Sequence, residues 1–166
     1  MIYAAEGSMF TRLCLTFVII ALWLTVSATA QPVTWYVSGV AFGEGGTGSG
    51  SFNYDADTNT YTNIDITTTA SITFPGGHYG FVNFSFANTS SQLTVVTSSA
   101  SDPLNLPVLG LNFTQALTGF GGTSNLFGSI EGLCGGTCNG IIVSRLLSEG
   151  TVGSSETLQQ FFAFGG

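Results

Sequence analysis

Basic side chains are almost absent from this chain of 166 residues, which has two Lys or Arg residues against nine Asp and Glu and a formal net charge of −7. Both are arginines, Arg12 and Arg145. So few cations cannot neutralise a row of phosphates, which argues against binding to nucleic acid or to an anionic membrane surface. The charged fraction of 7% is also far below the roughly 25% of an ordinary soluble domain. This composition is typical of an exported, turn-rich protein and not of a cytosolic helical one.

Residues that commonly act in catalysis are also scarce. The single histidine is His78, and there is no lysine, which removes most general bases, Schiff-base amines and multi-histidine metal sites. His78 follows Pro75-Gly76-Gly77 and no Gly-x-Ser-x-Gly elbow is present, so an exposed or capping loop histidine is expected instead of a triad member. The sequence therefore predicts no catalytic residue and no cofactor, and a protein that is not an enzyme.

Acidic residues leave one catalytic alternative open. Glycoside hydrolysis needs two carboxyl groups that face each other, and spacing along the chain does not show that any two do so. A carboxylate-dependent glycoside hydrolase is thus the third-ranked function. Its candidate carboxylates are Glu44, Asp55, Asp57, Asp65 and Glu131.

Residues 1–30 have the features of a cleavable signal peptide. Leu13–Val26 is a run without charge that follows Arg12, and it is too short to span a bilayer comfortably. The run leads to Ala28-Thr29-Ala30, the small-x-small pattern that signal peptidase reads, so cleavage is expected after Ala30 with Gln31 as the first mature residue. Met9 is the better start, because the acid Glu6 lies in the segment before it. No membrane span is expected after cleavage.

The remaining chain shows the two-residue alternation of β-strands and no long helical stripe. Turn-forming residues at 55–60 separate two of the expected strands and predict a hairpin. Strands at this spacing indicate an all-β fold, an antiparallel β-sandwich or jelly roll over residues 31–152, with a flexible tail at 153–166. The expected strands are Val33–Phe42, Ser51–Tyr54, Tyr61–Thr69, Val82–Phe86, Leu93–Thr97 and Leu109–Phe113.

Two of the three cysteines belong to the mature chain. Cys134 and Cys138 enclose a Gly-Gly-Thr turn, whereas Cys14 is lost with the leader. Paired cysteines in an exported protein predict a structural disulfide, here one that pins the turn between the last two strands. A zinc site would need two further ligands, and the only histidine is far away in the sequence.

The expected hairpin turn is a weak candidate for calcium. Asp55, Asp57 and Asn59 alternate as the oxygen ligands of an EF-hand loop do, and Asn63 and Asp65 continue the pattern. However, Thr60 stands where the loop requires glycine, and Ile66 stands where a bidentate acid would close the shell. Turn chemistry explains the same residues without a metal, so weak binding or none is expected.

Aromatic residues offer a second kind of site, since flat rings beside polar groups bind sugar faces. Trp35 lies in the most apolar strand and is expected in the core. If the aromatics are buried, a structural role is favoured. If several are exposed in a shallow groove, a carbohydrate-binding module is favoured. The candidate rings are Trp35, Tyr36, Tyr54, Tyr61 and Tyr79.

Two stretches resemble a known class of exported bacterial proteins. Ser38–Thr69, with its glycine-rich strand followed by Tyr-Asp-Ala-Asp-Thr, looks like the opening strands of small proteins of the PEP-CTERM class, and Cys134–Cys138 with Ser144-Arg145 resembles a turn near the end of that domain. The resemblance implies a β-rich protein exported by bacteria that make extracellular polysaccharide. The Val-Pro-Glu-Pro motif, apolar helix and basic end of that class do not occur in Glu156–Gly166, so neither sorting nor anchoring is carried over.

Leader, low charge, disulfide and resemblance together predict a non-catalytic bacterial protein that is secreted and belongs to the cell surface or extracellular matrix. Extracellular polysaccharide or matrix proteins are its expected partners. A carbohydrate-binding module is the alternative.

Overall fold

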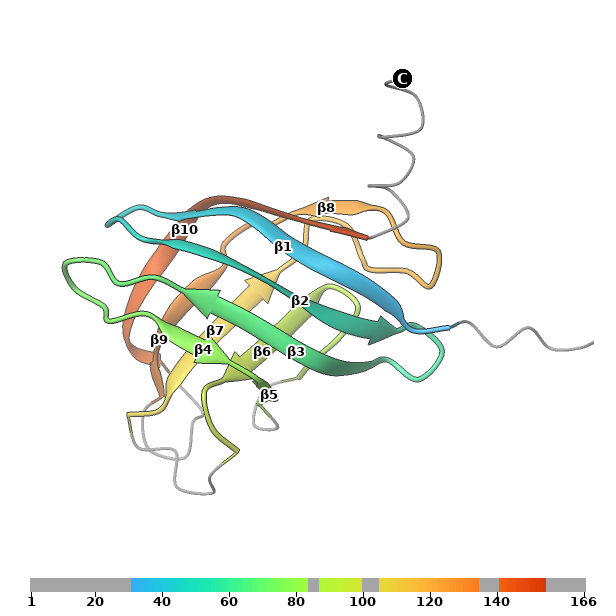
Figure 1. Cartoon of the computed structure of the whole chain (residues 1–166), viewed down its shortest axis with the longest axis horizontal. Helices are drawn as coiled ribbons and strands as arrows, with labels where there is room; N and C mark the ends of the chain where they lie inside the picture. Colours follow the sequence, from blue (N-terminus) through green and yellow to red (C-terminus); the bar gives the residue numbers. More distant parts are fainter. Residues whose placement is uncertain (1–30, 84–86, 100–104, 135–140, 155–166) are drawn as a thin grey trace, which may run out of the picture.

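The structure is a computed structural model that describes residues 31–83, 87–99, 105–134 and 141–154 (Figure 1). Within these residues every regular element is a β-strand. The strands are β1 Val33–Phe42, β2 Thr47–Asp55, β3 Thr60–Thr68, β4 Gly77–Tyr79, β5 Phe81–Val82, β6 Gln92–Val96, β7 Pro107–Asn112, β8 Thr123–Asn125, β9 Ile130–Cys134 and β10 Ile141–Ser154.

The strands form one antiparallel sheet that curls until it is nearly closed. Its order is β4-β3-β2-β1-β10-β9-β7-β6-β5, and β8 pairs with β10 beside this path. Only Gly80 separates β4 from β5, and its N–H donates to Val96 O at 3.3 Å, so the two ends of the path meet. Figure 1 shows β1 in blue lying beside β10 in red. The all-β antiparallel prediction is confirmed, and the described strands form one continuous sheet. The finer prediction of a β-sandwich or jelly roll stays a prediction.

The first three strands follow the alternation expected from the sequence. In β1, Trp35 and Val37 are buried while Tyr36 and Ser38 are exposed. β2 and β3 pair as the predicted hairpin, with Asp55 opposite Thr60. The expected strands Val33–Phe42 and Ser51–Tyr54 left the glycine-rich residues 43–50 as a connection, but Thr47–Gly50 already pairs within β2.

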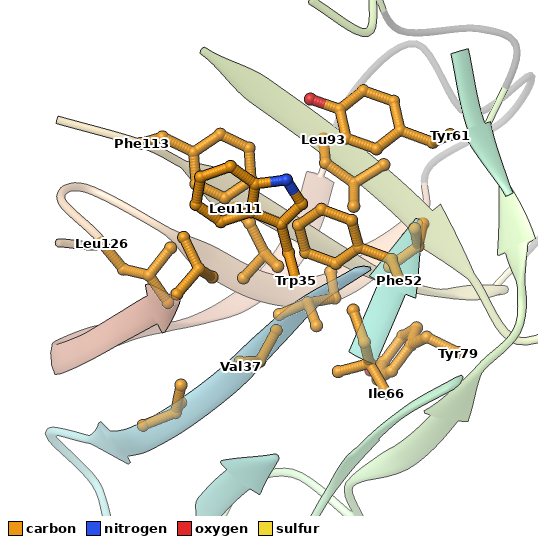
Figure 2. Packing of buried hydrophobic residues seen from close by; sticks show 14 of the residues in the cluster. Trp35, Val37, Phe52, Tyr61, Ile66, Tyr79, Leu93, Leu111, Phe113 and Leu126 are labelled. Carbon is orange, nitrogen blue, oxygen red and sulfur yellow. The ribbon is translucent and has the colours of Figure 1, made fainter. Parts of the chain in front are cut away.

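Aromatic rings fill the inside of the curled sheet. Trp35 is 2% exposed and Phe52 is fully buried, and the Phe52 ring centroid lies 5.6 Å from that of Tyr61 and 6.1 Å from that of Phe113. Figure 2 shows these rings gathered with Leu93 and Leu111. The prediction that Trp35 belongs to the core is confirmed.

The end of β10 extends the domain slightly. Gly153 and Ser154, which the sequence analysis assigned to the tail, pair with Tyr36 and Trp35 of β1. Ser154 also exchanges hydrogen bonds with Gly122, whose N–H donates to Ser154 Oγ at 2.9 Å. The sheet therefore reaches Ser154, while residues 155–166 of the expected tail lie outside the described part. None of the described segments is a helix with the length and apolarity needed to cross a bilayer.

Candidate functional site

A buried ion pair lies inside the curled sheet. Glu131 of β9 and Arg145 of β10 face each other in register, and their side chains are fully buried. Arg145 Nε donates to Glu131 Oε2 at 2.7 Å, and Nη2 lies 2.6 Å from the same oxygen. Buried charges are tolerated in proteins when they are paired and their remaining hydrogen-bonding positions are filled.

The other carboxylate oxygen of Glu131 is occupied as well. The hydroxyls of Thr68 and Tyr79 both donate to Oε1. Burial raises the pKa of Tyr79, and the hydrogen bond to Glu131 raises it further. Tyr79 therefore stays protonated and acts as a donor to the carboxylate, not as a base.

The guanidinium of Arg145 connects the pair to two turns. Nη1 donates to Gly45 O at 3.1 Å in the β1–β2 turn, and Nη2 donates to Thr69 O at 2.7 Å after β3. The Phe42 ring covers the group, with its centroid 3.8 Å from Arg145 Cζ. The carboxylate of Glu131 and the guanidinium of Arg145 are thus both hydrogen-bonded to protein partners, and the cluster ties β9 and β10 to two turns.

Sequence reasoning missed this cluster. Glu131 was considered only as a candidate hydrolase carboxylate, and Arg145 only as a charge and as part of the resemblance to a turn. One signal was present: the mature chain has a single basic residue, and it stands within a mainly apolar run, Ile141-Ile142-Val143-Ser144-Arg145-Leu146-Leu147. A lone cation in such a run needs a buried acid if it faces inward.

The remaining candidate carboxylates lie on the outside. Asp65 Oδ1 is 2.9 Å from His78 Nε2, and both side chains are more than half exposed. Glu44 accepts a hydrogen bond from the Thr73 hydroxyl on the exposed surface. His78 is exposed as expected, although it belongs to β4 and not to a loop. In the described residues no three His, Cys, Asp or Glu side chains are grouped as metal ligands.

The residues of the weak calcium candidate form the β2–β3 turn. Asp55 Oδ1 accepts the N–H groups of Asp57 at 2.9 Å and Thr58 at 3.3 Å, and hydrogen bonding from Thr58 lowers the pKa of Asp55. Asn59 takes a positive φ of 52° and its Oδ1 accepts from the Tyr54 hydroxyl at 2.9 Å. These oxygens already serve the turn, and weak calcium binding or none at this segment stays a prediction.

Parts of two other predictions fall outside the described residues. Cys134 is buried at the end of β9, and β9 and β10 pair as the last two strands, but Cys138 lies in the undescribed segment between them. Ala30 of the expected cleavage site is likewise outside, whereas Gln31 is the first described residue and is exposed. The disulfide and the cleavage site therefore stay predictions.

Oxidation of Cys134 and Cys138 is expected to join them in one intramolecular disulfide. The mature chain contains no other thiol to compete. Intact mass should rise by two hydrogens on reduction, and iodoacetamide should label neither cysteine until a reductant is added. Labelling of both cysteines without reductant would contradict the prediction.

Most of the candidate sugar-stacking rings are inside the sheet. Trp35, Tyr54, Tyr61 and Tyr79 are buried. Burial is the main cause that raises the pKa of Tyr61, and the charge of Tyr54 raises that pKa further. Tyr36 is the exception and is 41% exposed on the outer surface of β1.

A shallow groove lies on the same outer surface, where β10 runs between β1 and the segment that follows β8. We call it the outer groove. Its volume is about 390 Å³, and its lining residues are Gly39, Asn125, Leu126, Ser148, Glu149, Gly150 and Thr151. Most of these residues offer hydroxyl, amide, carboxylate or backbone groups, which can form hydrogen bonds with a polar ligand.

Comparison of the chain with known protein families, with curated proteins and with solved structures found no match. Functional inference therefore depends on the geometry of the chain itself.

Proposed function

We propose that this chain is a non-catalytic bacterial protein that is exported through its leader and serves as a structural component of the cell surface or extracellular matrix. The observation that carries the proposal is the use of Arg145 and Glu131 inside the fold. Arg145 is the one basic residue of the mature chain, and it is buried in an ion pair with Glu131. Tyr79 donates to the same carboxylate, so these three groups, which could otherwise act in catalysis, stabilise the fold.

The outer surface supports the same function. The strands β1, β2 and β3 present short neutral polar side chains to solvent, joined across strands by contacts such as Thr34 Oγ1 to Asn53 Oδ1 at 2.9 Å. A surface of this kind is well hydrated and carries little charge to attract ionic partners. It suits a protein that lies among hydrated polysaccharides. The outward residues include Ser38, Thr47, Ser49, Ser51, Thr62 and Thr67.

Export is tested by expressing the full chain in a bacterial host and analysing cytoplasmic, envelope and medium fractions by mass spectrometry. The expected product begins at Gln31 and lies outside the cytoplasm. An Ala30→Phe variant is the control, since a large residue at the cleavage position keeps the leader attached. Recovery of the parent chain in the cytoplasm with Leu13–Val26 intact would overturn the proposal.

Absence of catalysis is tested on the same exported protein. Incubation with neutral and amino polysaccharides is expected to release no new reducing ends, because Glu131 is held by Arg145. Steady release of reducing ends that an Asp65→Asn variant abolishes would assign a hydrolase instead.

A further inference from the structure

The outer groove is produced by an irregularity in the pairing of β1 with its neighbours. The register of β1 shifts between Ser38 and Ala41 against β10, and between Val37 and Val40 against β2. Gly39 lies within this bulge and takes a φ of 62°. Bulges bend a strand and redirect its side chains, and they often stand next to binding sites.

Gly150 deepens the groove on the opposite strand. A Cβ at Gly150 would lie 2.9 Å from Val40 Cγ2 and 3.0 Å from Leu126 Cδ1, so the backbone of β10 lies directly against the core at this point. A side chain at this position would point toward the core, so only a glycine allows the backbone of β10 to lie this close to Val40 and Leu126.

The acidic residue that lines the outer groove is Glu149. Glu149 is exposed, and among the described residues it makes no side-chain hydrogen bond or ion pair. Its neighbours are already linked to the sheet, since Ser148 Oγ donates to Ala41 O at 2.9 Å and Thr151 Oγ1 lies 3.2 Å from Ser38 Oγ. Glu149 is therefore the charged group that the outer groove offers to a ligand.

Tyr36 lies in line with the outer groove. It is two residues before Ser38 on the same face of β1, a separation of about 7 Å along a strand, and Ser38 contacts the groove residue Thr151. Gly153 stands opposite Tyr36 on β10. Gly153 has no side chain to cover Tyr36, and the nearest atom to its missing Cβ is Thr123 Cγ2 at 3.2 Å.

We propose that Tyr36 and the outer groove together bind a segment of polysaccharide that contains protonated amino sugars. The Tyr36 ring offers a surface for stacking on a sugar face, the groove offers hydroxyl and amide groups for the sugar hydroxyls, and Glu149 offers an anion for the ammonium group. Charge decides the class of polysaccharide. Arg145, the one Lys or Arg among the described residues, is buried, and the exposed His78 belongs to β4, which three strands separate from β10, so the outer groove has no cation to pair with an anionic polymer.

This inference deepens the proposed function by naming a partner. It rests on that function only in that the protein must be exported to meet the polysaccharide outside the cell. The test uses the exported protein and a glucosamine hexasaccharide, with the fully N-acetylated hexasaccharide as the uncharged comparison, at about pH 6, where carboxylates are ionised. Isothermal calorimetry is expected to show saturable binding that favours the glucosamine oligomer and weakens as salt is raised.

Variants then assign the residues. Tyr36→Ala should weaken binding of both oligomers about five- to ten-fold, whereas Phe120→Ala, which removes a ring that is 92% exposed in the β7–β8 loop, should leave it unchanged. Glu149→Gln should weaken only the glucosamine oligomer, by about three-fold. Glu44→Gln, which makes the same change of charge at another exposed site, is its matched control.

Three results would overturn the inference. These are no saturable binding by the parent protein, equal binding of the two oligomers, and binding that Tyr36→Ala does not alter. Failure here leaves the export result unaffected, because export is measured by location and N-terminal mass. A protein that is exported but does not bind would keep its structural role and lose the amino-sugar partner.

Discussion

Arg145→Met is expected to lower the free energy of unfolding by about 3–5 kcal/mol. The methionine leaves the fully buried carboxylate of Glu131 without a cation, and the penalty of an uncompensated buried charge dominates the loss. It also removes the donors to Gly45 O and Thr69 O, which tie two turns to the inside of the sheet. Urea denaturation at neutral pH, followed by far-UV circular dichroism, measures the change.

A double variant separates the cost of the unpaired buried charge from the cost of losing the Arg145 side chain. Glu131→Leu combined with Arg145→Met removes both ions and fills the space with apolar atoms, and replacement of a complete buried pair is often neutral or stabilising. The double variant is therefore expected to be more stable than Arg145→Met alone. Glu44→Gln on the exposed surface serves as the control and should change stability by less than about 0.5 kcal/mol. A double variant no better than the single one would show that the lost hydrogen bonds of Arg145 matter more than the unpaired charge.

The strands were predictable because alternation is a local property. Trp35 and Tyr36 are neighbours in β1, so placing Trp35 in the core already sends Tyr36 outward. The β2–β3 hairpin was predictable for the same reason, since turn-forming residues lie between two alternating runs. Exposure of Tyr36, the ring that the proposed binding surface uses, followed from the sequence in principle.

Closure of the sheet and the ion pair were not predictable from the sequence. Glu131 and Arg145 meet only because β9 and β10 pair in one particular register, and a shift of one residue would turn one of the two outward. The outer groove depends on the bulge at Gly39, which interrupts the alternation of β1. Such features arise from pairing between distant strands, and composition does not encode them.

Glycine in β2 was misinterpreted for a different physical reason. Its low strand propensity suggested a connection, but Gly48 and Gly50 lie where β2 passes close to other atoms. A Cβ at Gly48 would be 3.1 Å from Val40 Cγ1. In this segment glycine marks close contact between strands.

Gly50→Ala is expected to destabilise the protein by about 3 kcal/mol or more, of which the backbone conformation accounts for about 1–3 kcal/mol. Gly50 has a φ of 146°, a region that side chains rarely enter. A Cβ would also lie 2.1 Å from Asp65 O and 2.6 Å from Ile66 Cα, and both are backbone atoms that cannot rotate away. The added methyl group therefore forces β2 and β3 apart.

Two matched glycines separate the contributions to this effect. Gly43→Ala has no atom within 4 Å of the new Cβ and no positive φ, so a change below about 0.5 kcal/mol is expected. Gly39→Ala also meets no atom within 4 Å but has a φ of 62°, so it should cost about 1–2 kcal/mol through backbone strain alone. Thermal and urea unfolding of the three variants should rank Gly50→Ala as the least stable and Gly43→Ala as the most stable. Equal losses for Gly50→Ala and Gly39→Ala would mean that β2 shifts to relieve the clash, and that the β2–β3 register is less rigid than its backbone contacts imply.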